Sequence, residues 1–478
     1  MSVRVRIAPS PTGLIHVGNV RAALFNWLFA RHHQGTFIVR IDDTDVERSL
    51  PEFEADILEG LRWLGLDWDE GVEVGGPHGT YRQSDRFDRY CQAAEQLIDS
   101  GQAYYDDRSP EELEKLRQRA QTEKRHPNFY IRRPENTAAS GVIRFAVPQG
   151  VAVEFHDEVR DEMRFEAETV DDFVILRSDG IPTYHLASTV DDIDYEITHV
   201  VRGEDLLPST PKHVVLTKAL GATPPIYAHL PLLFGPDGKK LSKRHGDTSL
   251  RAYREGGYLP EAMVNFMSLL GWSLEGDRTI FSRNDAIAAF DLKRVSKNPA
   301  VFDVEKLAWL NGEYIRAMPA EEFTTQVRPF LEEGLGRTLS DDEWQLFDSV
   351  APLVQERIKF FTEAAGQVAF LFTDDLVYDH ASWEKVMTFE AEPVLSAASA
   401  RLEQLEDWNH ESLEAALRGM LDELGLNARK GLQPLRVAIT GSSVSPPLFE
   451  SIAALGRERT LRRLSIAAAR SGGSEPAR

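Results

Sequence analysis

We expect an α/β fold from this sequence: a domain built on a parallel sheet, interrupted by an inserted α+β domain and followed by an all-α C-terminal region. Three observations lead to this expectation. A strand pattern, a helix pattern and a second strand pattern follow one another within residues 1–42, as in a β-α-β unit. Charged helical and short strand patterns replace this alternation over residues 105–170. Helical patterns dominate after about residue 250.

The opening β-α-β unit begins with residues 3–8, which read VRVRIA and alternate valine or isoleucine with arginine, as a strand does. Residues 20–33 carry apolar side chains at helical spacing, and Gly35 follows as a candidate C-cap. Residues 36–42, TFIVRID, predict the second strand. Ligands of parallel sheets bind beyond the carboxyl ends of the strands, so the loop over residues 9–19 is the expected binding position.

Two later segments mark the change of pattern. Residues 110–125 read as a charged helix, and residues 173–188 as a strand-like, turn-rich stretch. We therefore expect a divided α/β domain and two helical regions, the second ending in a disordered tail at residues 469–478. The expected boundaries are 1–104 and 191–249 for the two halves of the α/β domain, 105–190 for the insertion, and 250–324 and 325–478 for the helical regions.

Composition excludes several classes of protein. The chain has 54 Lys and Arg against 76 Asp and Glu, a formal net charge of −22. This total charge argues against a protein that binds nucleic acid. Electrostatic interactions are screened beyond about 10 Å, however, so local patches of charge, and not the total, determine whether nucleic acid binds. Cys91 is the single cysteine, which excludes an internal disulfide and a multi-cysteine zinc site. We expect a cytoplasmic protein, since there is no secretory signal and no apolar run of about 20 residues.

The loop over residues 9–19, PSPTGLIHVGN, has the composition of a phosphate site. A helix N-terminus favours an anion, a glycine such as Gly18 admits close approach, and His16 adds a donor. The prolines stiffen the loop. The alternative is an ordinary proline-rich turn in which Asn19 is the N-cap of the helix.

A second polar loop, KKLSKRHGD, covers residues 239–247. Lys240, Ser242 and Lys243 suit a pyrophosphate that gains negative charge as a bond breaks. The alternative is a solvated basic turn. The two loops together, in this order on a divided sheet, are more specific than either one.

The sequence resembles a known family at these loops. RIAPSPTGLIHVGN and KLSKR resemble the two signature motifs of class I aminoacyl-tRNA synthetases. Further segments resemble the bacterial glutamyl-tRNA synthetases: ALFNWLFAR, RIDDTD, PTYHLA, VVRGED, VFDVEKLAWLNGEYI, PLRVAITG and SPPLFESIAALGRERTLRRL. The resemblance covers residues 3–465. It implies a Rossmann-like catalytic domain, an insertion that binds the tRNA acceptor end, a stem-contact domain and an all-α anticodon-binding region.

The resemblance implies a two-step reaction. L-Glutamate and ATP, which brings Mg²⁺, form glutamyl adenylate and pyrophosphate, and the acyl group then passes to the 3′ end of tRNA(Glu). The attacking carboxylate is already ionised, so the site has to align it and stabilise charge without a general base. The implied catalytic residues are His16, Lys240 and Lys243. The implied ATP-binding residues are Pro9, Ser10, Pro11, Thr12, Gly13, His16, Gly18, Asn19, Glu204, Lys240, Leu241, Ser242, Lys243 and Arg244.

The resemblance also implies an amino-acid pocket. Arg6 and Arg202 would bind the side-chain carboxylate with Tyr184, and Asp42 would face the ammonium. Without the resemblance, the favoured interpretations are a solvent-facing strand residue for Arg6 and the cap of a following turn for Asp42. By the resemblance, this chain departs from its family at three positions: Asn19, where the motif usually has histidine or a variable residue, Asp42, where many relatives have glutamate, and Ser188, where some have asparagine. The full set of implied glutamate-binding residues is Arg6, Ala8, Ser10, Asp42, Tyr184, Ser188 and Arg202.

Metal and RNA partners complete the expectations. Residues 103–113, where some relatives hold zinc with cysteines, contain none, so we expect no protein-bound zinc and place His126 on the surface. A locally basic end of the chain would read splayed anticodon bases. Its residues are Arg429, Lys430, Arg436, Arg457, Arg459, Arg462 and Arg463. We expect a monomer with no membrane contact.

Several alternatives to this assignment stay open at the level of sequence. The first is whether tRNA(Gln) is charged as well as tRNA(Glu). The others are a glutaminyl enzyme, the short relative that glutamylates a modified tRNA base, a nucleotidyltransferase without RNA, and a non-catalytic RNA-binding paralogue.

Overall fold

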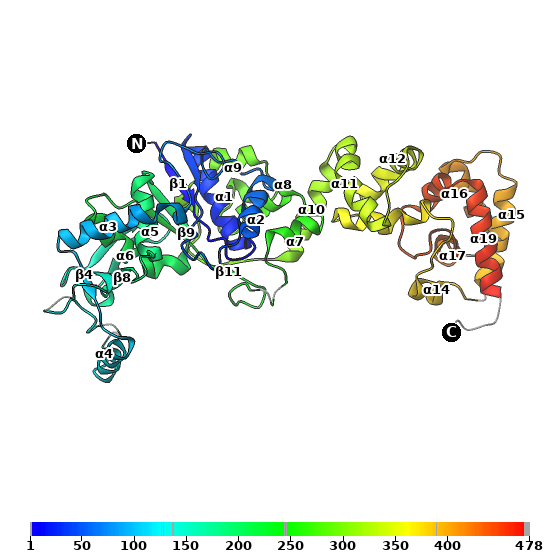
Figure 1. Cartoon of the computed structure of the whole chain (residues 1–478). Coiled ribbons are helices and arrows are strands. Elements are labelled where there is room, and N and C mark those ends of the chain that lie inside the picture. Colours follow the sequence, from blue (N-terminus) through cyan, green and yellow to red (C-terminus); the bar gives the residue numbers. More distant parts are fainter. Residues whose placement is uncertain are drawn as a thin grey trace. The chain divides into compact units, whose positions relative to one another are not determined.

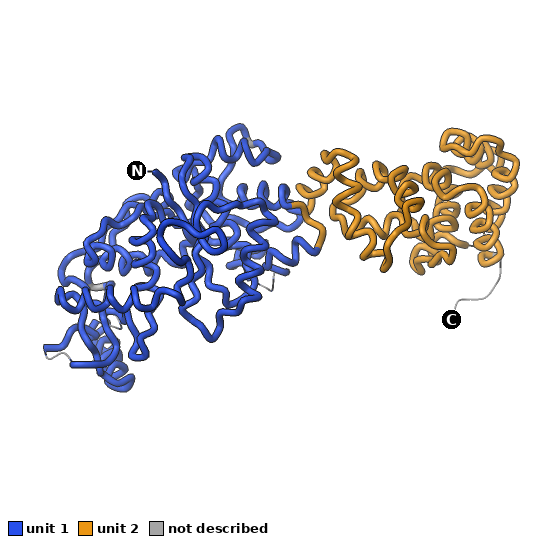
Figure 2. Tube along the Cα trace, turned by 45° about the horizontal axis from the view of Figure 1, so that its top comes forward, with its two compact units in different colours: residues 1–255, 260–307 blue, residues 256–259, 308–478 orange. Residues whose placement is uncertain are grey.

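The computed structural model describes residues 2–125, 127, 129–135, 138–242, 244, 246–388 and 390–472. The chain forms two compact units, residues 1–255 with 260–307 and residues 256–259 with 308–478 (Figure 2). Two residues with predicted positions, Lys243 and His126, lie outside the described part. Among the residues that the structure describes, none of the helices has the length and apolar character needed to cross a membrane.

The first unit opens with the predicted β-α-β arrangement (Figure 1). Strand β1 (Arg4–Ile7) leads into helix α1 (Val17–His32) and strand β2 (Thr36–Val39), and β1 pairs with β2 in parallel. Strand β3 (Glu70–Gly71) extends the sheet beyond β2, also in parallel. The parallel sheet expected from the sequence is therefore confirmed.

A second group of strands continues from the other side of β1. Strand β9 (His199–Gly203) follows Thr198, whose backbone N–H donates to the carbonyl of Arg4 (3.0 Å). Strand β10 (Ile226–Leu230) pairs with β9 in parallel. The chain order thus reverses between β1 and β9, and open parallel sheets bind ligands at such a reversal.

The inserted residues contribute to two sheets. An antiparallel sheet has the order β4 (Ala103–Asp106), β5 (Val142–Phe145), β8 (Phe173–Leu176). The hairpin of β6 (Val153–Asp157) and β7 (Asp161–Phe165) instead joins β10, next to Tyr227. The α+β character of the insertion is confirmed, and its hairpin forms one edge of the sheet that carries β9.

Helix α5 (Tyr184–Asp194) lies where we expected strand and turn. Thr183 occupies its N-cap position, and the apolar side chains of Leu186, Ala187 and Val190 are buried at helical spacing. The segment between Pro182 and the acidic residues Asp191 and Asp192 is too short for its helical periodicity to be recognised in the sequence. The remaining elements of the first unit are α2 (Pro51–Trp63), α3 (Phe87–Asp99), α4 (Pro110–Thr122), α6 (Thr210–Ala219), β11 (Leu233–Phe234), α7 (Leu250–Glu255), α8 (Pro260–Ser268), α9 (Arg283–Ala289) and β12 (Ala300–Val301).

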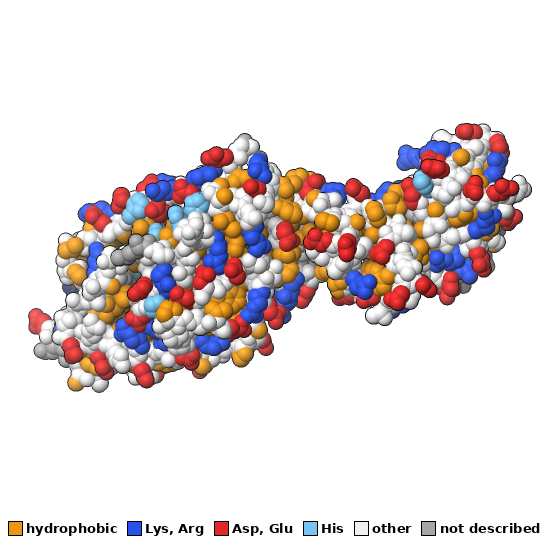
Figure 3. All heavy atoms as spheres, turned by 90° about the horizontal axis from the view of Figure 1, so that it is seen from above, with side chains coloured by type: hydrophobic (Ala, Val, Ile, Leu, Met, Phe, Trp, Pro, Cys, Tyr) orange, Lys and Arg blue, Asp and Glu red, His pale blue; other side chains and the backbone are white. Residues whose placement is uncertain are grey.

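The second unit is helical in its described residues, as predicted, and α10 (Val304–Ala317) begins in the first unit and continues into it. Figure 3 shows Lys and Arg side chains dispersed among Asp and Glu on the visible face. Helix α19 (Arg457–Gly472) includes the first residues of the tail that we expected to be disordered. The other helices are α11 (Ala320–Leu335), α12 (Asp341–Gln355), α13 (Ala364–Val368), α14 (His380–Val386), α15 (Ala391–Glu403), α16 (His410–Glu423), α17 (Ala428–Thr440) and α18 (Leu448–Leu455).

The prediction that Gly35 caps α1 is wrong. The C-cap is His33, and Gln34 takes the left-handed conformation with φ of 51°. Its N–H donates to Arg31, and the N–H of Gly35 donates to Ala30 (2.8 Å), as in a Schellman motif. Gly35 is required for another reason, because a Cβ there would lie 2.3 Å from the carbonyl oxygen of Val3.

We expect Gly35→Ala to lower the free energy of unfolding by about 2 kcal/mol or more, because β1 would have to move away from the new methyl group. Gln34→Gly in the same turn is the matched control. It should change stability by less than about 1 kcal/mol, since relief of the left-handed strain offsets the added freedom of the unfolded chain. Urea unfolding of the full chain measures both, and equal stability of Gly35→Ala and the wild type would contradict the close contact.

Candidate active site

A cavity of about 600 Å³ lies at the carboxyl ends of β1, β2 and β9, within the first unit. The structure brings most of the predicted site residues together around it. The lining residues that we predicted are Arg6, Ala8, Pro9, Ser10, Thr12, His16, Gly18, Asn19, Asp42, Tyr184, Ser188, Arg202, Lys240 and Leu241. Among the predicted residues that the structure describes, those that do not line it are Pro11, Gly13, Glu204, Ser242 and Arg244.

His16 is the N-cap of α1, so the alternative with Asn19 as the cap is wrong. Its Nδ1 accepts the backbone N–H of Gly18 (3.0 Å). Burial, with a further contribution from the positive charge of Lys240, lowers the pKa of His16. A neutral ring whose Nδ1 is an acceptor carries its proton on Nε2, which leaves an N–H donor for an anion in the cavity.

The first N–H groups of α1 already have partners. The N–H of Val17 donates to Thr248 (3.0 Å), and those of Gly18 and Asn19 donate to His16. We expected these groups to bind phosphate directly. The features of this terminus that suit an anion are the helix dipole and the His16 ring, which the Gly18 N–H orients.

The second polar loop follows β11. The N–H of Leu241 donates to the carbonyl of Leu233 (2.8 Å), which holds Lys240 beside the cavity. Arg244 lies away from the cavity and forms an ion pair with Asp237 (3.4 Å). Of the two predicted catalytic lysines, Lys240 is thus placed next to His16, whereas Lys243 lies outside the described residues.

Glu204, predicted to bind ATP, has structural partners. One carboxylate oxygen accepts the N–H of Leu232 (2.7 Å), and the other forms an ion pair with Arg160. These contacts join the end of β9 to the segment after β10 and to the turn between β6 and β7.

The two predicted carboxylate-binding arginines project from adjacent strands, β1 and β9. Arg6 is only 4% exposed, so the alternative of a solvent-facing residue is wrong. Its Nε and Nη2 donate to the two oxygens of Asp192 (2.9 and 3.1 Å). The Nη1 of Arg202 donates to the hydroxyl of Tyr184 (2.9 Å), and its Nη2 donates to Thr210 (2.8 Å).

Asp42 is held by Arg40 and does not cap a turn. The Nε and Nη2 of Arg40 donate to the two oxygens of Asp42 (2.6 and 3.0 Å), and Nη2 also donates to Ser188 (3.2 Å). Burial is the largest influence on Asp42 and raises its pKa to about 6, against the opposing effect of Arg40. Asp42 and Ser188, two positions at which we expected a departure from the family pattern, therefore contact the same guanidinium.

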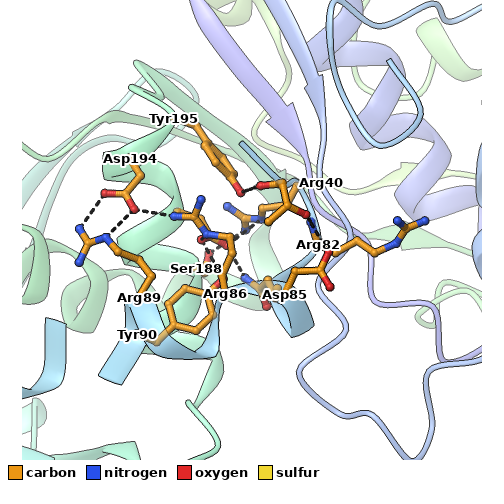
Figure 4. Close-up of polar contacts among 12 residues, drawn as sticks. Arg40, Arg82, Asp85, Arg86, Arg89, Tyr90, Ser188, Asp194 and Tyr195 are labelled. Carbon is orange, nitrogen blue, oxygen red and sulfur yellow. Dashed lines mark hydrogen bonds and ion pairs between the residues drawn. The ribbon is translucent and has the colours of Figure 1, made fainter. Parts of the chain in front are cut away.

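The Arg40 guanidinium is fully buried in an ionic network (Figure 4). It also pairs with Asp192 (2.9 Å) and lies 3.5 Å from Asp191. Asp191 pairs in turn with Arg86 (2.9 Å) and accepts from Tyr90 (2.9 Å), which ties α5 to α3. Sequence reasoning missed Arg40, Asp191 and Asp192, because no local pattern distinguishes a buried charge from a solvated one.

Several of the basic residues expected to read RNA have partners inside the second unit. Arg463 is 2% exposed and donates to the carbonyls of Ile439 (2.7 Å), Phe370 and Thr373. Arg436, Arg457 and Arg459 also donate to backbone carbonyls, and Arg462 pairs with Asp374. Arg429 and Lys430, together with Lys385, line a cavity of about 720 Å³ at the start of α17.

Comparison with known proteins identifies the family to which this chain belongs. Residues 2–309 match the catalytic domain of class I tRNA synthetases (E and Q), and residues 322–468 match an anticodon binding domain. Glutamate–tRNA ligases from Dehalococcoides mccartyi and Desulforamulus reducens are 49% and 45% identical to the chain, with 98% of this chain and 97% and 100% of theirs aligned. The chain belongs to the class I glutamate–tRNA ligases.

A solved structure agrees with this family along nearly the whole chain. The glutamate tRNA ligase from Elizabethkingia meningosepticum, crystallised in complex with its amino acid, is 33% identical and superposes with a TM-score of 0.84. The alignment covers 98% of this chain and 99% of that one. The predicted resemblance, the Rossmann-like catalytic domain and the helical anticodon-binding region are thereby confirmed. The match over residues 322–468 shows that this chain includes an anticodon-binding domain.

We expect Arg40→Met to lower the free energy of unfolding by about 3 kcal/mol or more, because it leaves Asp42, Asp191 and Asp192 without their shared cation. Arg89→Met is the matched control: Arg89 pairs with Asp194 in the same network but its side chain is 40% exposed, so the loss should stay below about 1 kcal/mol. Thermal unfolding compares the two, and similar losses would show that Arg40 is not central.

Proposed function

We propose that this chain activates L-glutamate with ATP and transfers the glutamyl group to the 3′ end of tRNA(Glu). One observation carries the proposal: a single cavity joins His16 and Lys240, suited to phosphate, with Arg6, Arg202 and Asp42, suited to an acidic amino acid. Family membership supports the same activity. Glutamine is disfavoured as the amino acid, because an uncharged amide gains less from two arginines than a carboxylate does.

The amino acid is held by charge at both ends. Of its five N–H donors, Arg6 uses two on Asp192 and keeps three, whereas Arg202 uses four on protein partners and keeps one, on Nη1, for the side-chain carboxylate. Tyr184 accepts from Arg202, so its own O–H proton is available to the same carboxylate. Asp42 faces the ammonium, and Ser188 is bound to the same Nη2 of Arg40 as Asp42. The loop residues Ala8 and Ser10 provide backbone groups.

The ATP phosphates lie against residues 9–19 and the second polar loop. An oxygen of the glutamate α-carboxylate forms a bond with the α-phosphorus while the bond to pyrophosphate breaks. Nε2–H of His16 and the ammonium of Lys240 stabilise the negative charge that develops, and Lys243 has the same role. ATP brings Mg²⁺ as part of the substrate, and no protein-bound zinc is proposed.

The second unit binds the anticodon. Arg429 and Lys430 are the most suitable of the predicted basic residues, because they line a cavity at the N-terminus of α17. We propose a cytoplasmic monomer that charges tRNA(Glu). Aminoacylation with purified tRNA(Glu) and tRNA(Gln) side by side tests whether the second tRNA is also a substrate.

We expect Lys240→Ala to reduce tRNA-dependent, glutamate-dependent ATP–pyrophosphate exchange by roughly a hundredfold, because the departing pyrophosphate loses a cation. Lys243→Ala should have an effect of similar size. Lys239→Ala is the matched control, since Lys239 is exposed and does not line the cavity, and its exchange rate should stay within about twofold of the wild type. Wild-type exchange by Lys240→Ala would contradict the proposed role.

Binding of glutamate should weaken as the pH falls through about 6, the raised pKa of Asp42, because the carboxyl then loses the charge that faces the ammonium. The fold should not weaken with it: the folded state takes up this proton before the unfolded state does, so protonation of Asp42 stabilises the fold. The measurement is the KM for glutamate against pH. Asp42→Asn should raise this KM and remove its pH dependence near 6, and an unchanged profile would contradict the assignment.

A further inference from the structure

A buried chain of hydrogen bonds lies behind Arg202. It crosses three adjacent strands, from Asp157 at the end of β6 through His229 on β10 to Arg202 on β9. Nδ1 of His229 lies 2.5 Å from Oδ2 of Asp157, and Nε of Arg202 lies 3.2 Å from Nε2 of His229. Asp157 and His229 are fully buried.

The two ends of this chain define the state of the imidazole. A guanidinium only donates and a carboxylate only accepts, so His229 has to donate from Nδ1 and accept at Nε2. A neutral ring with its proton on Nδ1 satisfies both neighbours. The other neutral tautomer or a charged ring would set an N–H against the N–H of Arg202. Burial lowers the pKa of His229, which favours the neutral ring.

The contrast with Arg6 shows what the imidazole achieves. Arg6 is paired directly with the carboxylate of Asp192, which offsets its charge. The described hydrogen-bond partners of Arg202 are all neutral: His229, Thr210, Tyr184 and the carbonyl of Leu206. The ring of His229 therefore lets Asp157 orient Arg202 without a direct ion pair between them.

We propose that Asp157 and His229 are positioning residues for the side-chain carboxylate of glutamate. They hold the Nε edge of Arg202 so that its Nη1 edge, next to Tyr184, faces the cavity with its charge uncompensated. This inference rests on the proposed function, in which Arg202 binds that carboxylate. It assigns selection of glutamate to residues that do not line the cavity.

Asp157→Asn tests which ring nitrogen of His229 has to carry the proton. Asparagine keeps an oxygen for the backbone N–H groups of Val159 and Arg160, so the turn after β6 is preserved. Its amide donates toward Nδ1 of His229 and forces the proton onto Nε2, against Arg202. We expect the KM for glutamate in tRNA-dependent ATP–pyrophosphate exchange to rise roughly tenfold or more, with the KM for ATP within about twofold.

Two substitutions of His229 separate positioning from packing. His229→Gln places an acceptor near the former Nε2, and His229→Asn places its amide near the former Nδ1 and leaves the Nε–H of Arg202 without an acceptor. His229→Asn should therefore raise the KM for glutamate more than His229→Gln does. Tyr227→Phe on the same strand keeps the ring beside Arg202 and is the matched control, expected to leave the KM for glutamate within about twofold.

Arg202→Lys completes the test, because lysine keeps the charge but has no Nε–H for His229. It should raise the KM for glutamate, and adding Asp157→Asn to it should have little further effect. The inference is overturned if Asp157→Asn matches Tyr227→Phe, if the KM values for glutamate and ATP rise together, or if His229→Gln is the worse variant. If Arg202→Lys itself leaves the KM for glutamate unchanged, the proposed glutamate site is wrong instead.

Discussion

The amino-acid side of the cavity depends on one buried cation, the guanidinium of Arg40. Burial of an ion is costly unless it is paired and hydrogen-bonded. Arg40 contacts Asp42, Asp191 and Asp192, and Arg6 and Arg86 supply the balancing positive charges. Helix α5 carries two of these carboxylates, Asp191 and Asp192, together with Tyr184 and Ser188, which line the cavity, so the network that stabilises the fold also positions the pocket.

The site uses charge in two different ways. Arg6 and Asp42 are each paired with an opposite charge. The pairing fixes the orientation of the side chain but weakens its electrostatic attraction for a charged ligand. Arg202 is oriented by hydrogen bonds to neutral groups, so its positive charge is not offset by a paired carboxylate. A zwitterionic amino acid with an extra carboxylate has a net negative charge. A pocket with one uncompensated arginine matches that net charge, whereas a pocket with two would favour a dianion.

Local patterns predicted the opening unit well because strand alternation and helical spacing are properties of neighbouring residues. They failed where two local signals competed. Gly35 and Asn19 are the usual choices for helix caps, yet Gln34 and His16 take those conformations. In the first case the carbonyl of Val3, just before β1, lies too close to Gly35 for a side chain. In the second, the ring of His16 reaches back to the N–H of Gly18.

Two loops, residues 9–19 and 239–247, were recognisable as parts of one phosphate site from their composition and order along the chain, and together they identified the family. No sequence pattern showed that Arg40 would meet Asp191, or Arg202 would meet His229, since these pairs are separated along the chain and belong to different elements. Their meeting follows from the chain reversal between β1 and β9 and from the hairpin that joins β10. A buried charge takes its partner from the strands and helices packed against it, and that neighbourhood exists only in the folded chain.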